Sequence, residues 1–268
     1  MRPALLVAVS LLFGVLIGAA AISPLAAPSP DREVIYQVST IDALLESVYD
    51  GVVLAGELTR YGDFGIGTFD SLDGEMIFVD GIVYQARSDG SVRIAPDDLT
   101  VPLVAVTFLD HDLVVNNLST VNYSAFEELM SGHIRSENLM YAVRIDGLFS
   151  SVTVRAPNRQ ERPYPRLVDA LADQYMATYT NIQGSAVGFL LPEYMGGLNV
   201  PVYHLHFISD NRRVGGHIVD FSLDGATVTL DETLTFMMQL PAEGGFIEAD
   251  LTADLSDELA VVERPDQK

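Results

Sequence analysis

Short runs of strand-forming residues separated by Asp-Gly pairs are the feature that most constrains this fold. MIFV (76–79) and IVYQ (82–85) flank Asp80-Gly81, and an Asp-Gly pair between two apolar runs is a strong signal for a β-hairpin. Further Asp-Gly pairs predict turns at 89–90, 146–147 and 224–225. The pattern therefore predicts many short strands, largely antiparallel.

Three segments predict helices. Residues 39–42 and 124–127 fit capping boxes, which predicts one short helix through Tyr49 and another that ends near Gly132. Leu167, Leu171 and Tyr175 recur at helical spacing, which predicts a third helix from 166 to 180. Few helices and many strands indicate an α+β protein with two mainly antiparallel or mixed β-sheets.

The first thirty residues have the pattern of a secretory signal. Arg2 precedes an apolar run from Ala4 to Ile22, and LAAPSP follows as a small-residue cleavage zone. The run is also about long enough to cross a bilayer, so an uncleaved N-terminal anchor is the alternative. Both interpretations predict an exported protein, secreted or periplasmic, that contacts a membrane only if the leader is retained.

Composition narrows the classes of partner. The net charge is −22 and Lys268 is the only lysine, so we expect the chain to repel nucleic acid and anionic membrane surfaces. There is no cysteine, which excludes disulfides and thiolate metal ligands. A bound metal would therefore be held by imidazole and carboxylate groups.

Histidine is concentrated in one short segment. Of the five histidines, His204, His206 and His217 fall within VPVYHLHFISDNRRVGGHIVDF. Side chains at i and i+2 of a strand share a face, and the glycines before His217 allow the chain to return. Three imidazoles from a β-hairpin form a suitable site for Zn²⁺ with an open fourth position.

Taken alone, this cluster fits several classes of protein equally well. They are a zinc lyase of the carbonic anhydrase kind, a cupin-like metal site and a non-catalytic zinc-binding protein. His111 and His133 lie beside acidic or polar loop residues, and we expect both on the surface.

A series of longer motifs resembles the α-acetolactate decarboxylase family. The resemblance extends from about Tyr36 to Glu263. Its most specific segments are GDFGIGTFDSLDGEM (62–76), YAVRIDGLF (141–149), RPYPRL (162–167), GFLLPEY (188–194) and LNVPVYHLHFISDNRRVGGHIVDF (198–221).

The resemblance implies roles for individual residues. It implies a zinc ion on His204, His206 and His217. It also implies catalytic roles for Glu75 and Arg155, with Arg155 additionally binding substrate.

Two further assignments follow from the resemblance. Thr68, in the GIGTF motif, is implied to lie at the substrate-binding site. A catalytic glutamate of the C-terminal tail matches Glu263, and Glu258 is the alternative.

The implied reaction converts 2-acetolactate, a small anionic 2-hydroxy-3-oxo acid, to acetoin and CO₂. Breaking the bond to the carboxylate sends electrons into the neighbouring ketone, and a metal cation stabilises the enediolate charge. Arg155 suits a bidentate contact with the substrate carboxylate. Protonation is directed to one face, and the resemblance also suggests a homodimer.

The sequence suggests four parts of the chain. They are a signal peptide or anchor at 1–30, an N-terminal α+β domain at 31–147, a zinc-binding β domain at 148–247 and a tail at 248–268 that contributes to the active site.

Overall fold

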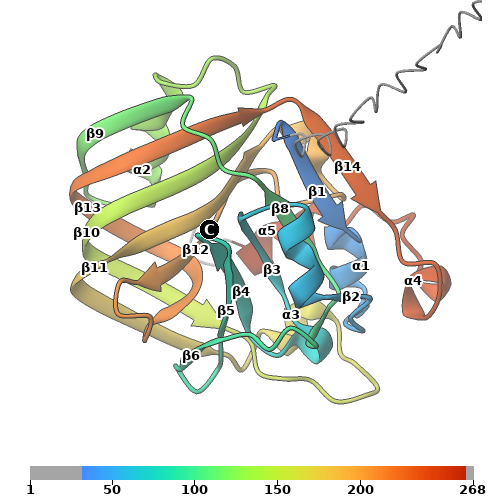
Figure 1. Ribbon diagram of the computed structural model, residues 1–268. Helices are drawn as coiled ribbons and strands as arrows, with labels where there is room; N and C mark the ends of the chain where they lie inside the picture. The colour runs from blue at the N-terminus through green and yellow to red at the C-terminus, as the bar shows by residue number, and fades with distance from the viewer. Residues whose placement is uncertain (1–31, 264–268) are drawn as a thin grey trace, which may run out of the picture. The chain divides into compact units, whose positions relative to one another are not determined.

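Two β-sheets dominate the computed structural model, which describes residues 32–263 (Figure 1). The predicted leader lies outside these residues. In the first sheet β1 and β14 are parallel and the other pairs are antiparallel. Its strands, in spatial order, are β14 (Thr235–Gln239), β1 (Val34–Val38), β8 (Val104–Thr107), β3 (Phe64–Thr68), β4 (Glu75–Val79), β5 (Ile82–Ala86) and β6 (Val92–Ile94).

The second sheet contains the long strands of the chain and is antiparallel throughout. Its strands, in spatial order, are β10 (Met140–Ala156), β11 (Tyr175–Leu191), β12 (Val202–Ser209), β13 (Gly215–Thr233) and β9 (Leu113–Thr120). Because β13 also pairs with β10, strands β10 to β13 close into a ring. Their side chains fill its interior, with Phe149, Phe207 and Phe221 in edge contact.

Short elements connect and cover the sheets. The helices of the described part are α1 (Ile41–Leu45), α2 (Tyr123–Ser131), α3 (Leu167–Ala170), α4 (Gly245–Glu248) and α5 (Ser256–Glu263). The remaining short elements are the strands β2 (Val53–Leu54) and β7 (Thr100–Val101) and the 3₁₀ turns η1 (Ala55–Arg60), η2 (Asp70–Leu72) and η3 (Glu193–Met195). Within residues 32–263, no helix has the length and apolar character needed to span a bilayer.

One apolar cluster joins the two sheets. Ile35, Phe64 and Ile77 of the first sheet pack with Phe189 and Ile208 of the second. The boundary that we expected between residues 147 and 148 falls inside β10, and the described residues all belong to one compact unit. The expected fold class is confirmed, with few helices, two sheets and the histidines in the second sheet.

The Asp-Gly pairs have two different structural roles. Asp80-Gly81 and Asp89-Gly90 form turns between neighbouring strands, as expected, and both glycines have positive φ. The predicted turns at 146–147 and 224–225 are wrong, because these pairs lie inside β10 and β13. There the β10–β13 register shifts, between Asp146 and Leu148 on β10, so the pairs accommodate a bulge instead of reversing the chain.

The third predicted helix is also largely wrong. Only Leu167–Ala170 is helical, and Tyr175 already begins β11. Residues 175–180 alternate between half-buried and exposed positions, and they pair with 151–156 of β10. These residues therefore alternate with the period of two that a strand requires. Pairing with β10 overrides the helical spacing in the local sequence.

Candidate active site

The three clustered histidines lie on the paired strands β12 and β13. His204 and His206 share one face of β12, and His206 is the register partner of His217. The close approach of β10 requires glycine beside this pair, since a Cβ on Gly216 would lie 2.4 Å from the carbonyl oxygen of Arg155. The same pairing places Arg155 opposite His217.

The histidine nitrogens converge on one point. One nitrogen from each ring lies within 4.8 Å of the other two, and this is the only such group of potential ligands in the described residues. Nε2 of His204 lies 3.2 Å from Nδ1 of His217. His206 is oriented by a 2.7 Å hydrogen bond between its Nδ1 and the carbonyl oxygen of Met76. Its buried Nε2 has no hydrogen-bond partner among the described residues.

Burial keeps these imidazoles neutral. Burial is the main cause that lowers the pKa of His204, to about 3, and the positive charge of Arg155 lowers it further. Burial also lowers the pKa of His206 and His217 well below the usual value, with added effects of the neighbouring histidines and Arg155. Neutral rings offer lone pairs to a metal, so the donor set fits a cation.

Glu75 approaches the histidines from the first sheet. It is the first residue of β4, and its Oε2 lies 3.6 Å from Nε2 of His206. Burial raises the pKa of Glu75 to about 8, although the charge of Arg155 opposes the rise. Burial thus favours the protonated form of this carboxyl group.

Arg155 is a buried cation beside the same centre. Its side chain is 4% exposed, and Nη2 lies 3.8 Å from Oε1 of Glu263. Its Nε is buried without a hydrogen-bond partner within residues 32–263. A buried guanidinium group with an unused donor is suited to bind an anion.

Glu263, at the end of α5, completes the cluster. Its Oε2 lies 3.5 Å from Nε2 of His217 and 3.8 Å from Nε2 of His204. Glu258, the alternative from the sequence, instead accepts a hydrogen bond from Arg166. Of the two tail glutamates, the structure therefore places Glu263 against the histidines.

Thr68 is close to the centre, but its hydroxyl group is engaged. It is buried and is the register partner of Glu75. Its Oγ1 donates to the carbonyl oxygen of Gly74 at 2.8 Å. The bond holds the backbone immediately before Glu75.

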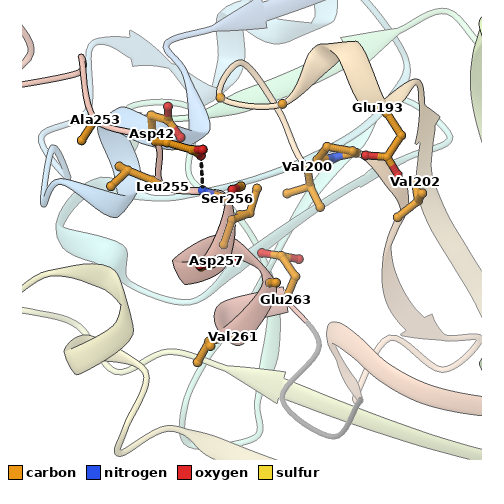
Figure 2. Close-up of a pocket in the computed structure, with 16 residues that line it drawn as sticks. Asp42, Glu193, Val200, Val202, Ala253, Leu255, Ser256, Asp257, Val261 and Glu263 are labelled. Carbon is orange, nitrogen blue, oxygen red and sulfur yellow. Dashed lines mark hydrogen bonds between the residues drawn. The ribbon is translucent and has the colours of Figure 1, made fainter. Parts of the chain in front are cut away.

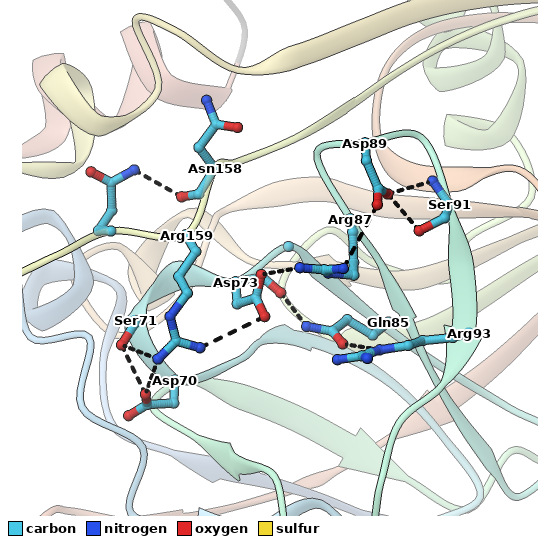
Figure 3. A network of polar contacts seen from close by, with 12 residues as sticks. Asp70, Ser71, Asp73, Gln85, Arg87, Asp89, Ser91, Arg93, Asn158 and Arg159 are labelled. Atoms are coloured by element: carbon cyan, nitrogen blue, oxygen red, sulfur yellow. Dashed lines mark hydrogen bonds and ion pairs between the residues drawn. The ribbon is translucent and has the colours of Figure 1, made fainter.

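A polar network, not identified from the sequence, holds the turn that precedes Glu75. Figure 3 shows Asp73 between Arg87 and Arg159, with ion pairs of 3.6 and 3.8 Å. Gln85 donates to the carbonyl oxygen of Asp73 at 2.5 Å. Because Arg159 follows β10 closely, the network ties the segment after Arg155 to the segment before Glu75. His111 and His133 are exposed, as expected.

A cavity of about 1100 Å³ borders the centre on one side of α5. Figure 2 shows Glu263 on its wall together with Val200, Val202 and Glu193. Asp42 and residues 253–257 line the part farther from Glu263 along the tail. Glu263 is thus the residue of the histidine centre that also lines this acidic cavity.

Comparison with known proteins identifies the family. The model of the α-acetolactate decarboxylase family matches residues 35–253. The chain belongs to the α-acetolactate decarboxylase family. It is 46% identical over 232 residues to the α-acetolactate decarboxylase of Methanosarcina mazei, covering 87% of this chain and 81% of the relative. It is 42% identical over 217 residues to that of Bacillus subtilis, covering 81% and 85% of the two chains.

Solved structures of the family share the fold. The crystal structure of the Bacillus subtilis α-acetolactate decarboxylase superposes with a TM-score of 0.84 at 40% identity, covering 86% of this chain and 99% of that one. A Staphylococcus aureus protein described as similar to the family superposes with a TM-score of 0.82 at 31% identity, covering 86% and 100%. The family match ends ten residues before Glu263, so the position of this residue comes from the structure.

Proposed function

We propose that the protein is an acetolactate decarboxylase that converts 2-acetolactate to acetoin and CO₂ with one zinc ion. The observation that carries the proposal is the convergence of three neutral imidazoles with Arg155, Glu75 and Glu263 in a chain of this family.

Zinc fits the histidine nitrogens. Two nitrogens on a tetrahedral zinc ion lie about 3.3 Å apart, close to the 3.2 Å between His204 Nε2 and His217 Nδ1. The bond from His206 Nδ1 to Met76 leaves Nε2 as its ligand atom, which is the usual way a backbone carbonyl fixes a metal-binding histidine. A bound zinc ion supplies a Lewis acid for the oxygen that gains negative charge in the reaction.

The reaction consumes one proton. The bond between C2 and the carboxylate breaks, CO₂ leaves, and the electron pair passes to the C3 ketone as an enediolate. One proton added at C2 then gives acetoin. The protein must therefore hold an anion and deliver a proton to one face of the product-forming carbon.

Arg155 and Glu75 have the properties that these two tasks require. The guanidinium group of Arg155 binds and orients the substrate carboxylate, because it is buried and retains an unused donor. Burial raises the pKa of Glu75 and so favours a protonated carboxyl group, which is suited to donate its proton at C2. Glu263 pairs with Arg155 and is the second carboxyl group beside the histidines.

Thr68 is proposed to act through Glu75 and not by contacting substrate. Its hydroxyl donor is committed to the carbonyl oxygen of Gly74. We therefore assign it to the position of the Glu75 backbone.

The test is metal analysis combined with an acetoin assay on purified protein. The wild type is expected to contain one zinc per chain and to form acetoin, whereas His206→Ala loses both. His133→Ala, a change of an exposed histidine, is the matched control. Full activity in His206→Ala would remove the metal from the mechanism, and CO₂ hydration without acetoin formation would favour the carbonic anhydrase alternative.

Export and oligomeric state stay predictions. The leader at 1–30 supports secretion or periplasmic localisation, with cleavage after the small-residue zone. N-terminal sequencing of protein from the native host tests cleavage. Sedimentation equilibrium tests the homodimer.

A further inference from the structure

The position of Glu263 depends on a very short helix. Helix α5 contains eight residues, and an isolated helix of this length is unstable in water. Contacts with the rest of the fold must therefore hold it. Because Glu263 is its last residue, any movement of α5 displaces the carboxylate from Arg155 and the histidines.

Apolar contacts hold one side of α5. Leu255, Leu259 and Val262 are buried in a cluster with residues of α1 and α3. The cavity of about 1100 Å³ borders the same helix, and Leu255 and Leu259 line it as well, so the packing around the helix is incomplete. Few side chains therefore oppose its release.

Electrostatics act against docking of the tail. Residues 248–263 contain six carboxylates and no lysine or arginine, in a chain with a net charge of −22. Such a segment is repelled by the rest of the protein unless specific cations meet it. Among the ion pairs of the described residues, Arg155 and Arg166 are the arginines that contact this segment.

Arg166 bridges the tail to α1. Its Nη2 lies 2.8 Å from Oε2 of Glu258 and 2.7 Å from Oε1 of Glu46. Both glutamate side chains are 22% exposed and that of Arg166 is 42% exposed, so solvent partly screens these ion pairs. We call Glu46, Arg166 and Glu258 the tail clamp.

The clamp and Glu263 act at different ends of the same helix. Glu263 follows Glu258 by five positions, which corresponds to about 7.5 Å along a helix and about 140° around it. Glu258 can therefore contact Arg166 while Glu263 points to the histidines. Leu259 and Val262 pack between them in the apolar cluster.

We propose that Arg166 is a positioning residue for Glu263, because the tail clamp holds α5 against α1 and α3. The proposal rests on the proposed function and extends it to residues outside the centre. Without Arg166, the carboxylates of Glu46 and Glu258 would face each other, and their repulsion would favour release of α5.

The test compares four variants of the full-length protein. Arg166→Met removes the charge and keeps an apolar stem, Arg166→Lys restores a charge, and Glu258→Gln weakens one arm of the clamp. Arg162→Met is the matched control, because Arg162 lies in the same loop and pairs with Asp50 outside the clamp. Each variant is measured for kcat, KM, zinc content and amide hydrogen exchange of residues 256–263.

Arg166→Met is expected to lower kcat and speed exchange in α5 by about tenfold each, the scale of one lost charge-assisted bond. KM changes by less than about threefold and zinc content stays constant, since Arg155 and the histidines are retained. Arg166→Lys recovers most of kcat, Glu258→Gln gives a smaller change in the same direction, and Arg162→Met behaves as wild type.

Unchanged α5 exchange in Arg166→Met would overturn the proposal, as would faster exchange throughout the protein with no preference for α5. If Arg166→Met does not fold, the same exchange measurement on Glu258→Gln tests the proposal. Exchange that is faster in α5 alone supports it, and unchanged or uniformly faster exchange overturns it. Exchange does not depend on the reaction. A wild-type protein that forms no acetoin would therefore remove the proposed function, while exchange still tests the clamp.

Discussion

Replacing Asp231 with Asn is expected to stabilise the protein at neutral pH. Asp231 lies on β13, fully buried, and its Oδ2 accepts a 3.0 Å bond from the backbone amide of Asp110. Its Oδ1 has no hydrogen-bond partner in the described part of the chain. Burial, reinforced by the charges of Glu33, Asp112 and Asp110, raises the pKa of Asp231 from 3.8 to about 6.

The direction of this pH effect follows from the coupling between ionisation of Asp231 and unfolding. A carboxyl group whose pKa is higher in the folded state ionises more readily when the protein unfolds. Below the pKa of the unfolded state, such a group does not change the free energy of unfolding. As pH rises through the pKa of the unfolded state and then that of the folded state, the group lowers this free energy progressively. The raised pKa of Asp231 lowers the free energy of unfolding by about 3 kcal/mol above pH 6. Asn keeps the acceptor for the Asp110 amide and removes the charge.

The assay is urea unfolding of wild type and Asp231→Asn between about pH 4.5 and pH 7.5. The variant's advantage in free energy of unfolding is expected to grow by about 2 kcal/mol over this range. Asp98→Asn, which removes an exposed carboxylate, controls for net charge. If the variant's advantage in free energy of unfolding does not change with pH, ionisation of Asp231 in the folded protein costs no stability, and the reasoning is refuted.

Two predictions concern the centre itself. Arg155→Ala is expected to lower kcat/KM by about a hundredfold or more while zinc content stays unchanged, measured by acetoin formation and metal analysis; wild-type turnover would exclude a role in binding the carboxylate. Thr68→Val removes the bond to the Gly74 carbonyl. It is expected to lower the free energy of unfolding by about 1–3 kcal/mol, measured by urea unfolding, and also to lower kcat. Thr68→Ser keeps the hydroxyl group and should retain most of both, whereas equal losses in the two variants would argue against the hydrogen bond.

Local sequence patterns predicted the paired strands that carry His204, His206 and His217, because strand periodicity and a glycine-containing reversal lie within one short segment. The same kind of local pattern failed for residues 171–180. There the helical spacing of Leu171 and Tyr175 was correct as a pattern, but pairing with β10 decided the structure. Propensity is a weak signal where a long partner strand is available.

The parts of the site that the residues alone did not reveal depend on contacts far apart in the sequence. The carbonyl oxygen of Met76 orients His206 across 130 residues, and any residue type supplies such an oxygen. Arg155 faces His217 through strand pairing, and no local signal marks it. Glu75, Arg155 and Glu263 were identified only through the family resemblance, and the Asp73 network and the tail clamp were not identified at all.

The closed ring of β10 to β13 has a consequence for metal exchange. The imidazoles are held by strand pairing on both sides of β13 and by the bond to Met76, and all of these constraints come from the protein itself. Binding therefore requires little reordering of the chain, so a chelator should empty the protein without unfolding it. Apoprotein prepared in this way is expected to rebind zinc, and also to accept other divalent cations that favour nitrogen donors.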